Sequence, residues 1–183
     1  MEHNINEGSY AQYDDWDVFS LKCVEYLMDN DELIWKLLKY NTPDAWDKPN
    51  LTMAQKRALI YDGVSDDTSQ YHVFMDMGQP DVITAEICQI RIHPYSLTAP
   101  NRVVGTIMMM FEVYSNYKIN HLTNLRTRND MIMKRFLQVF NGKNIGGIGR
   151  LNLDNLGSYG SRLETGGQLP FKGKWLLMGN RSA

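Results

Sequence analysis

Cysteine, excess charge and long apolar runs are all scarce in this sequence of 183 residues. The two cysteines, Cys23 and Cys88, stand far apart among apolar residues, so we expect buried, reduced thiols and a reducing compartment. The formal net charge of −2 lacks the basic excess that is typical of nucleic-acid-binding proteins. No apolar run approaches the roughly 20 residues that span a bilayer, and no secretory leader is recognisable, so we expect no membrane partner.

Motifs that carry catalysis are scarce as well. The four histidines are scattered without metal-ligand spacing, and no serine or cysteine stands in a nucleophile elbow. His93 or His121 could act as a base, but a hydrogen-bonded structural histidine is the favoured interpretation. The glycine-rich residues 142–150 follow a helix and precede a strand, which is the reverse of a phosphate-binding loop. We therefore expect no enzyme, no cofactor and no metal.

Apolar residues make up 43% of the chain, and eleven are methionine, which is adaptable and suits contact surfaces. The clearest pattern is alternation in residues 84–93 and 103–117, which predicts two strands. One face of the second strand is apolar and predicts a core face. The other is too apolar for solvent and too polar for a core, and it carries Thr106, Met108, Met110, Glu112 and Tyr114.

The length of this second strand leaves two interpretations open. Fifteen residues would extend roughly 50 Å, well beyond a usual strand. The strand either bends at a bulge near Gly105 and packs within its own domain, or offers its mixed face to another chain. We expect the five residues of the mixed face to form a subunit interface.

A helix that is apolar along one side follows this strand, capped by Thr127 and ended by Asn141 and Gly142. Basic residues lie at its start and along its polar side. They predict charge contacts with nucleic acid or with acidic residues of another subunit, and they are Arg126, Arg128, Lys134 and Arg135.

The chain divides into a flexible arm (residues 1–13), an N-terminal helical segment (14–62) and an α+β core domain (71–183). The segment predicts helices over residues 14–28, 33–40 and 53–61, the last of them opened by a capping box of Thr52 and Gln55. Residues 71–77 and 83–92 predict an antiparallel hairpin. Later strands are expected at 148–153, 162–165 and 169–178, with loops at 142–149 and 154–161. The fold class is therefore α+β, a mostly antiparallel sheet covered on one face by an amphipathic helix.

Several stretches resemble head–tail connection (neck) proteins of tailed bacteriophages. In the N-terminal half they are residues 31–40 (DELIWKLLKY), 42–46 (TPDAW) and 48–52 (KPNLT). In the second half they are 104–106 (VGT), 112–114 (EVY), 146–150 (GGIGR) and 169–174 (LPFKGK). The order of hairpin, helix and closing strands is similar to tail-terminator and tail-completion proteins.

The resemblance implies a virion structural protein, made in the host cytoplasm, that forms a homo-oligomeric ring of six or twelve subunits at the neck. The implied partners are portal, tail-tube and other neck proteins, with packaged DNA nearby. It leaves open whether the protein is a terminator, a stopper or an adaptor. An alternative hypothesis is a small intracellular nucleic-acid-binding or processing protein that uses the basic face of residues 126–141.

Overall fold

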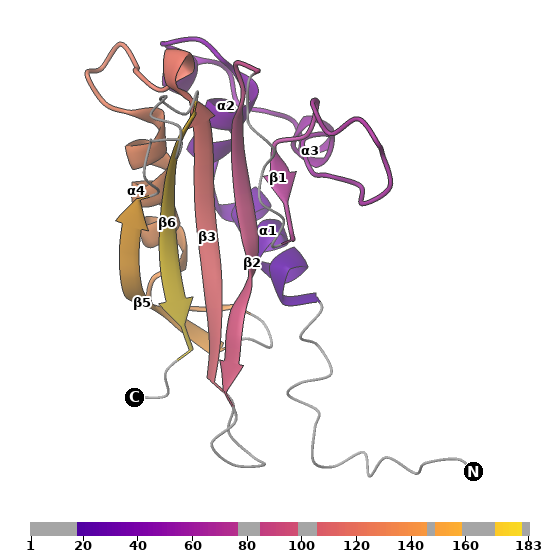
Figure 1. Ribbon diagram of the computed structural model, residues 1–183, viewed down its shortest axis with the longest axis vertical. Coiled ribbons are helices and arrows are strands. Elements are labelled where there is room, and N and C mark those ends of the chain that lie inside the picture. The colour runs from indigo at the N-terminus through magenta and orange to yellow at the C-terminus, as the bar shows by residue number, and fades with distance from the viewer. Residues whose placement is uncertain (1–17, 77–84, 99–105, 146–148, 159–170, 181–183) are drawn as a thin grey trace, which may run out of the picture.

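The computed structural model describes residues 18–76, 85–98, 106–145, 149–158 and 171–180. In these ranges a six-stranded, curled sheet carries helices on one face (Figure 1), which confirms the predicted mixed α+β class. The helices are α1 (Phe19–Asn30), α2 (Leu33–Lys39), α3 (Met53–Arg57) and α4 (Arg128–Phe140), with short 3-10 turns η2 (Ala45–Asp47) and η3 (Tyr117–Ile119).

The strands follow the order β1-β2-β3-β6-β5-β4 across the sheet. Every neighbouring pair is antiparallel except β1 with β2. Their bounds are β1 Val73–Phe74, β2 Cys88–Thr98, β3 Thr106–Asn116, β4 Lys143–Ile145, β5 Gly149–Ser158 and β6 Phe171–Gly179. The last strand therefore lies between the third and the fifth.

The predicted antiparallel hairpin of residues 71–77 and 83–92 is wrong. Strand β1 is only two residues long and runs parallel to β2, with Val73 opposite Ile90. Alternation identifies the two faces of a strand but not its direction. A parallel pair needs a connection of about a dozen residues, and residues 75–87 between the two strands provide one.

Strand β2 is longer than predicted, because it continues through Pro94 to Thr98, beyond the predicted end at residue 93. A bulge between Pro94 and Ser96 accommodates this. Past the short β1, that side of β2 has no partner among the described strands, so the missing N–H of Pro94 costs no ladder bond. The predicted bulge position, Gly105, lies outside the described residues.

Strands β4 and β5 occupy two regions that were predicted as loops. Residues 143–145 pair with 149–151, and β5 continues to Ser158 by pairing with β6 through a bulge between Leu153 and Asn155. Long-range pairing with β6 overrides the weak local preference of these polar and glycine residues. The strand predicted at 162–165 lies outside the described residues.

The core lies between the sheet and its helices. Apolar residues of β3 point into it, and the Phe111 ring packs at 5.3 Å from Phe136 and 4.8 Å from Phe140, centroid to centroid. The predicted Thr127 cap is confirmed, since its hydroxyl accepts the N–H of Asp130 at 3.1 Å. Cys23 and Cys88 are buried, unpaired thiols, as predicted, and burial raises the pKa of each to about 12.

Helices α1 and α2 share this core with the sheet. The predicted capping box of α3 is confirmed by reciprocal bonds between Thr52 and Gln55. The predicted arm at residues 1–13 lies outside the described residues. The division into a helical segment and a core domain stays a prediction.

Candidate interaction face of the sheet

The face of the sheet that turns away from the helices carries the residues that the sequence indicated as an interface. Figure 1 shows helices α1, α2 and α4 behind the strands, with the opposite face of β2, β3 and β6 toward the viewer. We call this the outer face. Because side chains alternate along a strand, it receives the even-numbered residues of β3 and the odd-numbered residues of β6.

One half of the outer face is polar, yet buried. The Glu112 carboxylate accepts a hydrogen bond from the Tyr114 hydroxyl at 2.8 Å and lies 3.1 Å from Nε2 of His93. All three residues are at most 6% exposed. Each oxygen of the Glu112 carboxylate thus has a hydrogen-bond partner, which a buried carboxylate requires. His93 thus serves as a hydrogen-bonded structural histidine, the favoured interpretation of its sequence position.

Arg91 extends this buried polar half toward β1. Its guanidinium pairs with Asp76 and lies 4.9 Å from the centroid of the Phe74 ring. These contacts join β1 to β2 through a charge pair and a cation–π contact. The Nε atom of Arg91 is buried and has no hydrogen-bond partner among the described residues.

The other half is apolar and partly accessible. We call Met108, Met110 and Trp175 the platform; each is partly accessible. Two glycines allow these side chains to lie down on the sheet. A Cβ at Gly157 would come within 2.4 Å of Trp175, and a Cβ at Gly179 within 2.7 Å of the Met108 sulfur. Such contacts are too short for any real Cβ, so the rigid Trp175 ring depends on glycine at position 157, whereas the flexible Met108 side chain could shift aside from a Cβ at position 179.

The structure therefore divides the predicted interface set. Thr106, Met108 and Met110 are accessible, whereas Glu112 and Tyr114 are buried within the subunit. Alternation along β3 does not identify Trp175, Gly157 or Gly179 as parts of this face. Glycines inside strand patterns were the available signal, because they often mark a close approach by another group.

Arg128, one of the four basic residues singled out, lies inside the protein with no exposed surface. Its Nε donates to the Ile119 carbonyl at 3.0 Å, and its Nη atoms donate to the carbonyls of Tyr40 (2.9 Å), Thr42 (3.1 Å) and Leu37. These last three carbonyls end α2 and the turn after it. Arg128 fastens α2 to the start of α4, so it takes no part in a basic surface.

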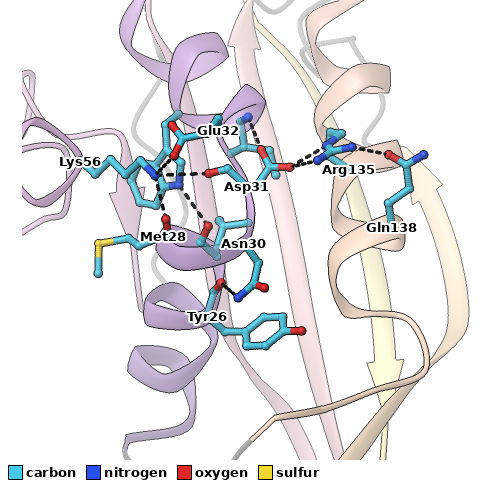
Figure 2. Close-up of polar contacts among 11 residues, drawn as sticks. Tyr26, Met28, Asn30, Asp31, Glu32, Lys56, Arg135 and Gln138 are labelled. Carbon is cyan, nitrogen blue, oxygen red and sulfur yellow. Dashed lines mark hydrogen bonds and ion pairs between the residues drawn. The ribbon is translucent and has the colours of Figure 1, made fainter. Parts of the chain in front are cut away.

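Arg135 is engaged at the corner between α1 and α2 (Figure 2). Its Nε donates to the carboxylate of Asp31 at 2.6 Å, and its Nη1 donates to Gln138 at 2.9 Å. On the other side of this corner, buried Lys56 donates to the carbonyl of Met28 and to the carboxylate of Glu32, each at 2.7 Å. The corner is an internal charge network that holds α1, α2, α3 and α4 together.

Arg126 and Lys134 remain exposed. The four basic residues therefore do not form one continuous basic surface, because one is buried and one is paired with Asp31. Among the described residues, no helix is long and apolar enough to cross a membrane.

Comparison with known proteins identifies one family. The YomW family model matches residues 31–162, which is well over half of the chain and runs from the α1–α2 corner beyond β5. No curated protein matches the sequence.

Proposed function

The chain belongs to the YomW family, a phage-derived family, and from this premise we propose that it is a structural protein of the phage virion. It forms a homo-oligomeric ring at the neck, joins the DNA-filled head to the tail, and has no catalytic role. Its partners are other copies of itself and the neighbouring portal, neck or tail-tube proteins.

The platform is the observation that carries this proposal. Met and Trp are enriched in the buried centres of protein interfaces, and an accessible apolar area of these residues is suited to packing against another protein surface. Full burial of one such side chain contributes about 1.5–3 kcal/mol, and each platform side chain is already mostly buried, so completing the burial of all three contributes at most about 3 kcal/mol. The buried polar half beside the platform fixes the shape of the surface without offering unpaired charge.

The nucleic-acid alternative has less support. Binding to phosphates needs several cations on one surface. Arg128 faces four carbonyls in the interior and Arg135 is paired with Asp31, which leaves Arg126 and Lys134 from the predicted set. In the proposed ring, nearby packaged DNA is a neighbour and not a specific ligand.

Replacing both Met108 and Met110 with lysine tests the role of the platform. Each lysine keeps a long apolar stem on the sheet but places an ammonium group where a partner would pack. We expect a folded monomer by circular dichroism and sedimentation velocity, whereas the wild type sediments as a ring. A double variant of Leu21 and Met53 to lysine is the matched control, since these residues are 41% and 43% exposed on the helical side.

Two results would contradict the proposal. The first is a wild-type protein that remains monomeric in solution at every concentration tested and is also present as single copies in the particle. The second is a platform variant that assembles like the wild type. Gold-labelled antibody on purified virions tests the location, since label is expected at the head–tail junction and label elsewhere excludes a neck protein.

A further inference from the structure

The turn between η3 and α4 presents a leucine fully to solvent. Leu125 is 99% exposed, more than any other large apolar side chain in the described residues. Its φ of 62° also makes it their single non-glycine residue in the left-handed region. That conformation is unfavourable for a side chain with a Cβ, and glycine or asparagine would adopt it more readily. An exposed leucine in a disfavoured backbone conformation has no evident role within the subunit.

The turn is nevertheless rigidly held. The N–H of Leu122 donates to the carbonyl of Arg126 at 3.0 Å, and the N–H of Leu125 donates back to Leu122 at 3.1 Å. Thr123 anchors the turn to the η2 region, since its N–H donates to the Pro43 carbonyl at 2.9 Å and its hydroxyl accepts from the Trp46 indole at 3.2 Å. Leu125 therefore projects from a fixed base, and ordering it in a complex would cost little entropy.

A second turn, which follows α3, is also held by hydrogen bonds and also has an exposed apolar residue at its tip, but its neighbouring charged residues are acidic. The Asp62 carboxylate accepts hydrogen bonds from the N–H groups of Val64 and Ser65, both at 3.0 Å. Val64 at its tip is 82% exposed. Exposed Asp66 and Asp67 follow it, whereas exposed Arg126 follows Leu125. Among the described residues, neither the Arg126 guanidinium nor the Asp66 carboxylate has an ion-pair partner.

The two turns lie at opposite side edges of the molecule. In Figure 1 the turn between β3 and α4 projects at the upper left, and the loop between α3 and β1 projects at the far right. Two different, complementary patches on opposite edges form a head-to-tail contact, and repetition of such a contact closes a ring when the rotation permits. A self-complementary dimer would instead bring identical patches together.

We propose that the Leu125 turn of one subunit docks on the Asp62 turn of the next copy of this chain. Leu125 packs against Val64, and Arg126 pairs with Asp66 and Asp67. This inference rests on the proposed ring and adds a specific subunit contact that is separate from the platform.

Substituting Leu125 with asparagine tests the apolar part of this contact, because asparagine tolerates the left-handed backbone. We expect an unchanged or slightly raised Tm together with self-association weakened at least about tenfold, measured by sedimentation velocity over a dilution series. The control is Leu21→Gln, which also removes an exposed aliphatic side chain, from α1. It should leave both quantities unchanged.

Charge reversal tests the partner. Arg126→Glu and Asp66→Lys should each weaken self-association, and the chain that carries both changes should recover part of it, because the pair with position 66 is restored with inverted sign while Asp67 keeps its charge. The proposed contact is overturned if Leu125→Asn associates as strongly as the wild type, or if the double charge variant shows no recovery of self-association. If the Met108 and Met110 lysine variant is monomeric while Leu125→Asn still assembles, the proposed function stands and this inference alone fails. A wild type that never associates refutes both.

Discussion

Replacing Arg128 with methionine is the sharpest test of how the helices are joined. The side chain has no exposed surface and donates to four carbonyls, those of Leu37, Tyr40, Thr42 and Ile119. Methionine is unbranched and apolar, reaches about as far as the Nε position of arginine, and removes all of these donors. Leu37 lies 91 residues away in sequence, so the lost bonds are those that fix α2 against α4.

The expected loss follows from two opposing terms. A hydrogen bond from a charged donor contributes about 1.5–3 kcal/mol, so four such bonds contribute roughly 6–12 kcal/mol. Removing the guanidinium also removes its desolvation penalty, which is several kcal/mol for a buried ion. We expect the difference, about 3–5 kcal/mol of unfolding free energy, to be lost. A typical domain has an unfolding free energy of about 5–15 kcal/mol, so this loss is a large part of it, but the variant should still fold.

Urea unfolding followed by circular dichroism measures this loss, and two variants calibrate it. Lys134→Met removes an exposed cation from the same helix, away from the proposed subunit contact, and should change the free energy by less than about 0.5 kcal/mol. Arg128→Lys should fall between, because one ammonium group cannot reach carbonyls on both sides as the planar guanidinium does. If Arg128→Met lowers the unfolding free energy by less than about 1 kcal/mol, the four carbonyls are hydrated in the variant, and Arg128 does not join the helices.

Three further predictions concern other parts of the fold. Hydrogen bonds from the backbone N–H groups of Ser65 and Val64 hold the pKa of Asp62 well below its usual range. Asp62→Asn should therefore lower the urea midpoint at neutral pH, and its difference from the wild type should narrow as the pH falls below about 4. A difference that does not change with pH would contradict this. Cys23 and Cys88 should resist iodoacetamide in the native protein at pH 8 and both react in urea without reductant, since burial raises their pKa to about 12; a denatured species that resists alkylation would indicate a disulfide. Gly157→Ala should displace Trp175, cost about 1–3 kcal/mol and weaken assembly, whereas exposed Ser158→Ala should change neither.

The sequence predicted those parts of the fold that local patterns determine. The Thr127 and Thr52 caps and the apolar side of β3 depend on residues within a few positions of one another, and the structure confirms them. The direction of β1, the extension of β2 past Pro94 and the strand in residues 154–158 depend on partners far away in the chain. Alternation and turn composition carry no information about those partners.

The outer face shows the same limit at the level of single side chains. The sequence identified Met108 and Met110 as unsuited to solvent, but not that Gly179 and Gly157 allow Met108 and Trp175 to lie flat. It grouped Arg128 with surface cations because its spacing on α4 does not show the four carbonyls that surround it. Which charges are buried is decided by tertiary packing, which helical periodicity does not describe.

The position of β6 in the sheet has a consequence for biosynthesis. This strand is the last in the described chain, yet it joins β3 to β5. While the chain is being made, β1, β2 and β3 can pair on one side and β4 with β5 on the other, but each group keeps an unpaired edge until residues 171–179 emerge. A nascent chain cut short before Phe171 would therefore expose two open edges to proteases and aggregation, and only chains made through this strand would complete the sheet.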